Sequence, residues 1–171
     1  EFVFNELKLT KAATIHDGST YAEALQAVFV AEFVKLGGTV VAQEAVTKET
    51  TDMSAVLTTV AAAGPEIIYF PVFVASAGFL KAQVGNIPGL ENVKTMGADG
   101  HFTPDFLKAA GAASVGHYLS SPNFAAFGAG NGALFQLVPL RWPLSTAVAG
   151  SMIGEVGALG GGFIPNAMGQ S

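Results

Sequence analysis

The chain has 171 residues, 13 acidic and 8 basic side chains, a formal charge of −5 and no cysteine. This length suits one domain of ordinary size, and the scattered lysines exclude the clustered basic surface that a nucleic-acid partner requires. The absence of cysteine excludes disulfides, thiolate metal sites and cysteine catalysis.

Charged residues are distributed unevenly along the chain. Beyond Phe124 the only charged side chains are Arg141 and Glu155, in a segment rich in glycine and apolar residues. We therefore predict two parts: an α/β domain over 1–123 and an apolar, Gly-rich, helical tail over 124–171. The chain opens at Glu1 without an initiator Met or an apolar leader, which we interpret as a cut that omits a signal peptide or an upstream domain.

Between 11 and 120, short β-branched runs alternate with helical stretches, which predicts a doubly wound parallel sheet covered by helices. In chain order, the predicted elements are strand 12–16, helix 21–36, strand 39–42, helix 53–63, strand 67–70, helix 75–84, strand 93–96, helix 105–110 and strand 116–120. Ser19 and Asp52 are placed to cap the first two helices.

The loops that follow the strands are where such a sheet binds ligands. They cover 16–21, 71–76, 98–103 and 120–123. Together they offer hydroxyls, carboxylates, aromatic rings and free amides at helix N-termini, which suit a small polar or zwitterionic molecule. The candidate ligand-binding residues are Asp17, Ser19, Tyr21, Phe73 and Asp99.

A series of short motifs carries a family resemblance. They are HDGSTY at 16–21, GGTVV at 37–41, TDMS at 51–54, PEIIYF at 65–70, GADG at 97–100, TPDFL at 103–107, GHY at 116–118 and SP at 121–122. In this order they resemble the second lobe of the branched-chain amino acid type of periplasmic solute-binding protein, which serves ABC transporters. The resemblance covers about the first three quarters of the chain, and the shared order of motifs is more specific than any one of them.

The resemblance implies one lobe of a type I periplasmic binding protein. It implies an extracytoplasmic location, an ABC transporter permease as partner, and capture of an amino acid or related molecule between two lobes. The family places a tyrosine against the ligand at the position of Tyr21, and the loop that contains Asp99 faces the cleft.

The chain departs from the family at two places. Relatives that bind amino acids often have a carboxylate for the ligand ammonium after the third strand, whereas this chain reads PVFVAS at 71–76. This departure argues against an aliphatic amino acid, so the candidate ligands are an amino acid and, equally, an amide, a small aromatic acid or another small metabolite stacked on Phe73. The family's first lobe is also missing, so we expect weak binding or none.

The tail resembles a different family. GAGNGALFQLVP at 128–139 and IGEVGALGGGFIPN at 153–166 resemble Gly-rich late transmembrane helices of nitrate/nitrite porters of the major facilitator superfamily. We interpret the chain as a chimera or rearranged gene, with a divergent end of the lobe as the competing interpretation. The tail could form homo-oligomers or associate with a membrane, so the alternative function is a fragment of an anion transporter or a membrane-associated fusion.

Enzymatic function is not expected. His16, His101 and His117 are too far apart in sequence for a helix-based metal pair, so no metal and no cofactor is predicted. No Gly-x-Ser-x-Gly elbow surrounds Ser19 or Ser76, which argues against a hydrolase. We expect His16 to bond to backbone at the end of its strand.

Overall fold

The structure is a computed structural model that describes residues 1–121. One sheet contains five strands in the order β2-β1-β3-β4-β5, and every neighbouring pair is parallel. The strands are β1 (Lys11–His16), β2 (Thr39–Ala45), β3 (Ile67–Tyr69), β4 (Lys94–Ala98) and β5 (His117–Ser120). The helices are α1 (Phe2–Asn5), α2 (Thr20–Lys35), α3 (Ser54–Ala62), α4 (Val74–Val84) and α5 (Pro104–Ala110), with 3-10 turns η1 (Asp99–His101) and η2 (Gly111–Ser114).

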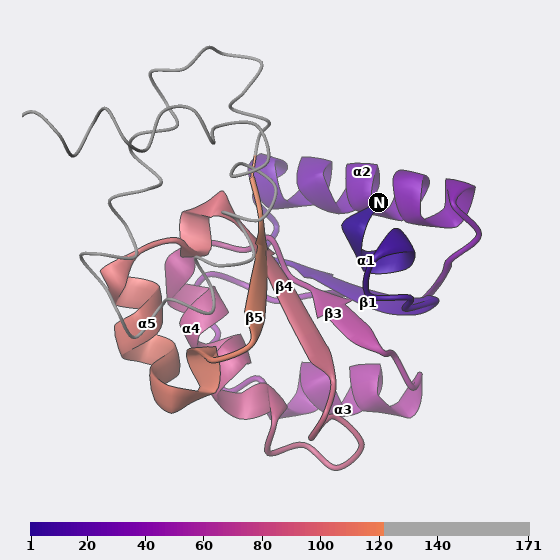
Figure 1. The fold of residues 1–171 in the computed structure, drawn as a ribbon. Helices are drawn as coiled ribbons and strands as arrows, with labels where there is room; N and C mark the ends of the chain where they lie inside the picture. Colours follow the sequence, from indigo (N-terminus) through magenta and orange to yellow (C-terminus); the bar gives the residue numbers. More distant parts are fainter. Residues whose placement is uncertain (122–171) are drawn as a thin grey trace, which may run out of the picture.

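Helices cover both faces of the sheet (Figure 1). Helices α1 and α2 lie on one face, and α3, α4 and α5 lie on the other. The larger hydrophobic core forms under α3, α4 and α5, where Ile15, Ile68 and Phe70 meet Leu57 and Leu80. A smaller core on the opposite face joins α1 and α2 to the sheet. The predicted doubly wound α/β fold is therefore confirmed.

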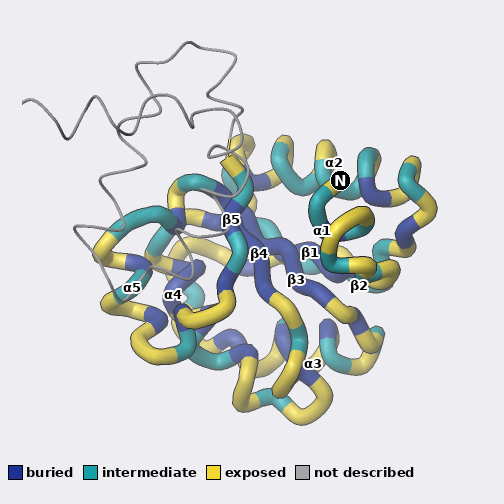
Figure 2. Tube along the Cα trace, viewed as in Figure 1, coloured by how far each residue is buried: buried dark blue, intermediate teal, exposed yellow. Residues whose placement is uncertain are grey.

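The central strands are buried on both faces, as parallel sheets require. All three residues of β3 and four of the six residues of β1 are buried, whereas no residue of the edge strand β2 is. Figure 2 shows this contrast as a dark interior strand region surrounded by partly exposed helices. Burial on both faces explains why these strands are runs of apolar residues without a polar alternation.

Local signals set the helix ends. The Ser19 side chain accepts a hydrogen bond from Ala22 N–H and begins α2, and Thr103 does the same for α5 through Phe106 N–H. Gly37 follows α2 with a φ of 100°, a conformation that other residues adopt only with strain. Asp52 accepts a hydrogen bond from Ser54 N–H at 2.9 Å, so its carboxylate assists the start of α3 from just outside the helix.

The element bounds differ modestly from those predicted. β2 continues three residues further than predicted, and β4 runs from Lys94 to Ala98 rather than from 93 to 96. The short helix α1 was not predicted. Packing of Phe4 and Val3 into the smaller core holds this helix. A four-residue segment carries no sequence signal of such tertiary packing.

The predictions for 124–171, including a helical tail, self-association and membrane contact, lie outside the described residues. Within 1–121, no helix combines the length and apolar character that a membrane crossing demands.

Candidate functional site

The candidate site lies at the carboxyl edge of the sheet, between β1 and β3. The order β2-β1-β3 means that the chain leaves β1 toward one side and later continues on the other, so this is the topological switch point, where sheets of this kind bind ligands. The loops after β1 and β3 therefore meet there. This topology gives a physical reason for residues near 17 and near 73 to act together.

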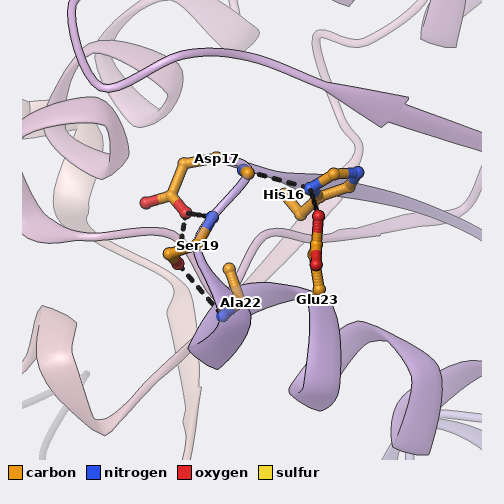
Figure 3. A network of polar contacts seen from close by, with 6 residues as sticks. His16, Asp17, Ser19, Ala22 and Glu23 are labelled. Atoms are coloured by element: carbon orange, nitrogen blue, oxygen red, sulfur yellow. Dashed lines mark hydrogen bonds and ion pairs between the residues drawn. The ribbon is translucent and has the colours of Figure 1, made fainter.

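A network of polar contacts fixes the loop between β1 and α2 (Figure 3). The Asp17 carboxylate accepts hydrogen bonds from the Ser19 hydroxyl at 2.5 Å and the Ser19 N–H at 3.1 Å. Gly18 N–H donates to Nδ1 of His16, and Glu23 Oε1 lies 3.8 Å from the same nitrogen. His16 thus bonds to backbone at the strand end, as its position predicts.

Asp17 also connects the two loops at the switch point. Its Oδ2 accepts a hydrogen bond from Phe73 N–H at 2.9 Å, across 56 residues of sequence. Burial raises the pKa of Asp17, but the hydrogen bonds from Phe73 and Ser19 outweigh burial and leave the pKa below its usual value. With only 4% of its surface exposed, the carboxylate is committed to holding the loops.

Two exposed aromatic rings from these loops stack on each other. The rings of Tyr21 and Phe73 lie 5.8 Å apart, with 29° between their planes. They remain 39% and 46% exposed, unlike the core aromatics Phe70 and Phe106, which are buried. Soluble proteins expose large apolar side chains singly as a rule, so a stacked exposed pair at a topological switch point indicates a binding surface.

Asp99 is hydrogen-bonded to the tyrosine of the aromatic pair. The Tyr21 hydroxyl donates a hydrogen bond to Asp99 Oδ1 at 2.5 Å, which joins the first turn of α2 to η1. Partial burial and this carboxylate both raise the pKa of Tyr21, so the hydroxyl stays protonated and can donate. Asp99 also accepts from Gly100 N–H, and its half-buried position leaves the carboxylate partly open to solvent.

Two further features were not predicted from the sequence. Lys48, in the loop after β2, places Nζ 5.2 Å from the centre of the Phe73 ring. Helix α4 begins beside this ring, and its N-cap residue, Phe73, supplies no side-chain cap. The Asp17 carboxylate, which accepts from Phe73 N–H, is the anionic group that lies at this helix start.

The structure separates the five predicted residues into two groups. Tyr21 and Phe73, both exposed, and the half-buried Asp99 form one cluster that can contact a ligand. Asp17 and Ser19 bond to each other, and Asp17 bonds to Phe73 N–H, so these two residues hold the loops that carry the cluster. In the fourth predicted loop, Ser120 Oγ bonds to Tyr69 and to the carbonyl of Gly97, and 122–123 lie outside the described residues.

A close pair of histidines could not be predicted from the sequence spacing. Nδ1 of His101 lies 3.1 Å from Nε2 of His117, in the core behind the site. The separation of 16 residues gives no helix-based pair, and the contact arises because η1 and β5 meet across β4. Within 1–121, no three histidine, aspartate or glutamate side chains gather as metal ligands would.

The fold defines a class of protein. The structure overlaps a branched-chain amino acid transporter substrate-binding protein from Streptococcus pneumoniae, solved with isoleucine, with a TM-score of 0.64 and 22% identity. The overlap covers 83% of this chain and 40% of that one. The fold is therefore one lobe of a type I periplasmic binding protein, as the resemblance implied.

Sequence comparison finds relatives of the same kind. The chain is 34% identical over 111 residues to an amino acid binding protein of Pseudomonas aeruginosa, which covers 65% of this chain and 29% of that protein. It is 36% identical over 84 residues to a Leu/Ile/Val-binding protein homolog of Brucella melitensis, covering 49% and 23%. No family model matches the chain. Both relatives are amino acid binding proteins by name, and the chain spans less than a third of either.

Proposed function

We propose that residues 1–121 form the ligand-binding lobe of a solute-binding protein that serves an ABC transporter. The observation that carries this proposal is the stacked, exposed pair of Tyr21 and Phe73 at the topological switch point, with Asp99 beside it. The relatives are binding proteins rather than enzymes, and the described site offers surfaces and hydrogen bonds instead of an activated nucleophile.

The ligand class follows from what surrounds the aromatic pair. The two rings offer a flat apolar surface, Asp99 accepts a hydrogen bond, and Lys48 beside the Phe73 ring attracts a negative group. A small molecule with a donor at one end and a carboxylate or carbonyl at the other suits this arrangement. We infer an amino acid, an amide or a small aromatic acid.

Affinity depends on how completely the ligand is enclosed. The described residues contact a ligand from one side, whereas a two-lobe clamp removes both sides from water. A ligand that keeps one face in solvent gains less from burial against its lost freedom. We therefore propose weak binding by this lobe.

The partner and location are proposed by similarity. An ABC transporter permease and an extracytoplasmic location are typical of the proteins that this lobe resembles. The alternative function, a fragment of an anion porter or a membrane-associated fusion, depends on 124–171 and so lies outside the described residues. The contacts around Tyr21 favour solute binding over that alternative.

The test is ligand-dependent thermal unfolding of the full 171-residue chain. We expect leucine, glutamine or benzoate, or one class among them, to raise the unfolding midpoint. At ten times the Kd the gain is about 1.4 kcal/mol, or about 3 to 6 °C for a chain of this size. Nitrate belongs in the panel because it represents the porter alternative.

Variants locate the site. Tyr21→Ala should abolish the shift, whereas Tyr21→Phe, which keeps the ring but loses the bond to Asp99, should weaken it. Phe79→Ala is the matched control, because Phe79 is another exposed aromatic, 40% exposed on α4. A shift that survives Tyr21→Ala, or one produced by nitrate alone, would contradict the proposed site.

A further inference from the structure

A buried histidine pair lies behind the aromatic pair. His101 ends η1, His117 begins β5, and each is 1% exposed. Their rings stack at 5.4 Å between Phe70 and Phe106, whose rings lie 5.0 to 5.6 Å from those of the histidines. Two histidines in an apolar stack cost free energy unless their polar atoms are satisfied, so their partners decide what they do.

The hydrogen bonds of the pair define its protons. His101 Nε2 lies 2.7 Å from the carbonyl oxygen of Val72, which can only accept, so Nε2 carries the hydrogen. In neutral His101, Nδ1 then accepts, and His117 Nε2 must donate to it. His117 Nδ1 in turn accepts from the Thr95 hydroxyl at 2.9 Å. One arrangement satisfies every ring nitrogen, and both histidines are neutral in it.

The chain of hydrogen bonds ends at the ligand-binding loop. Val72 directly precedes Phe73, whose N–H bonds to Asp17 and whose ring stacks on Tyr21. Tyr21 bonds to Asp99, which begins the same 3-10 turn that His101 ends. Turn η1 therefore holds this loop by two contacts. His101 bonds to the 72–73 peptide on the buried side, and Asp99 bonds to Tyr21 of the aromatic pair on the exposed side.

Space at this point is reserved for the histidine ring. A Cβ built on Gly97 would overlap the ring of His101. Any residue other than glycine there would displace the ring from the Val72 carbonyl. The glycine in β4 and the histidine in η1 thus form one arrangement, in which the backbone of the sheet makes room for the ring.

We propose, on the basis of the function proposed above, that the neutral His101–His117 pair positions Phe73 for ligand binding and releases it when the pair takes up a proton. His101 is the positioning residue, and His117 and Thr95 fix its tautomer. The contact with the ligand belongs to Phe73 and Tyr21, so the histidines act through the 72–73 peptide.

A proton has two places to bind, and both disturb the pair. On His101 Nδ1 it would face the N–H of His117 at 3.1 Å. On His117 Nδ1 the Thr95 hydroxyl can turn to accept it, but the charge is then buried among aromatic rings and repelled by Lys81. Asp99 and Asp17 favour a charged His101, yet burial prevails and lowers its pKa to about 4. Uptake of a proton therefore requires the pair to loosen toward water.

The test follows the Phe73 amide by hydrogen exchange in the full chain, with no ligand present. Its protection factor reports the bond to Asp17, and the amides of Leu57 and Val60 in α3 serve as internal controls. His101→Phe keeps the ring stack but removes the donor to Val72. We expect it to lower protection at Phe73 at least tenfold while leaving the α3 amides unchanged.

His101→Gln is the matched variant, because its side-chain amide can donate to the same carbonyl. It should restore most of the protection and reduce its dependence on pH, because only His117 of the pair can still take up a proton. In the unmodified chain, protection at Phe73 relative to α3 should fall as the pH approaches 4, where His101 takes up its proton, in step with histidine ring 15N shifts that report protonation. This titration uses the unmodified chain, so it tests the proposal even if His101→Phe fails to fold.

Two results would overturn the proposal: equal Phe73 protection in the His101→Phe variant, or histidine shifts that change while Phe73 protection does not. Because neither measurement uses a ligand, failure of the ligand panel remains a separate outcome. For any panel compound that binds, His101→Phe should raise the Kd about tenfold, and His101→Gln should leave it unchanged. An unchanged Kd in both variants would contradict the link to binding.

Discussion

Asp17 shows how a residue of the candidate site can act without contacting a ligand. Its carboxylate accepts three hydrogen bonds, two from Ser19 and one from Phe73 N–H, and is almost wholly buried. These contacts fix the start of α2 and the turn before α4 relative to each other. The residue therefore sets where Tyr21 and Phe73 meet.

Replacing Asp17 with asparagine should destabilise the fold. Asparagine keeps one acceptor oxygen but turns an NH₂ group toward a donor, and it removes the charge that strengthens these bonds. We expect a loss of about 2 to 3 kcal/mol in the free energy of unfolding, measured by urea denaturation. The control is Glu49→Gln, an exposed carboxylate in the loop after β2, which should change stability by less than about 0.5 kcal/mol. Equal effects of the two variants would contradict the role given to Asp17.

Residue-scale predictions succeeded where the cause is local. The sequence around 17–21 predicts a turn and a Ser19 cap, because each depends on neighbours a few positions away. The bond from Phe73 to Asp17 spans 56 residues, and the histidine contact depends on η1 meeting β5. Such contacts require the sheet order, which the strand pattern alone leaves open.

At the scale of elements, α4 and α5 pack unusually closely at one point. A Cβ built on Gly78, in the middle of α4, would overlap the Cβ of Ala109 in α5. Gly78 is buried, so the two helix backbones can approach only because it has no side chain. The glycine thus weakens α4 as a helix but permits its contact with α5.

Gly78→Ala should therefore destabilise the chain although alanine favours helix. The overlap costs about 1 to 3 kcal/mol, and the better helix propensity offsets up to about 1 kcal/mol of this. The control is Gly85→Ala at the C-cap of α4, where φ is −71° and nothing lies within 4 Å of the new Cβ. Calorimetry should show a lower midpoint for the first variant and an equal or higher one for the second. Parallel behaviour of the two would contradict the close helix contact.

Most elements were predictable because hydrophobic period and Gly, Pro, Ser or Asp boundaries agree with the final fold. The exceptions have tertiary causes. Helix α1 has only four residues, too few to show a helical period, and η1 forms after a strand where the sequence shows only a glycine-rich loop. Helix α2 is apolar on more than one side, with exposed Val28 and Val34, so its direction toward the sheet could not be deduced from its sequence.

For the whole molecule, the buried histidines predict a pH dependence of stability. Burial lowers the pKa of His101 from 6.5 to about 4 and that of His117 well below 6.5. Between these values the unfolded chain binds protons that the folded chain does not, so the folded state loses stability as pH falls from about 6.5 to about 4. The slope is up to about 1.4 kcal/mol per pH unit for each histidine that stays neutral.

Urea denaturation across this range should reveal the loss. Glu66 acts lower in pH, because hydrogen bonds from the N–H groups of Thr10 and Lys11 hold its pKa below the usual 4.5. Its contribution is present above about pH 4.5 and is lost as pH falls further. A decline that begins near 6.5 therefore points to the histidines. Constant stability from pH 6.5 to 5 would show that the pair takes up protons without loosening.

The all-parallel sheet also shapes how the chain reaches its fold. Every neighbouring pair of strands is parallel, so the sheet of residues 1–121 contains no hairpin that could form early from adjacent residues. Strand β1, flanked by β2 and β3, has to wait for partners that emerge later in the chain. The chain loses the entropy of loop closure before strand pairing stabilises it. We therefore expect refolding in milliseconds to seconds rather than microseconds in a stopped-flow measurement. During synthesis, β1 therefore remains without partners until β2 and β3 follow.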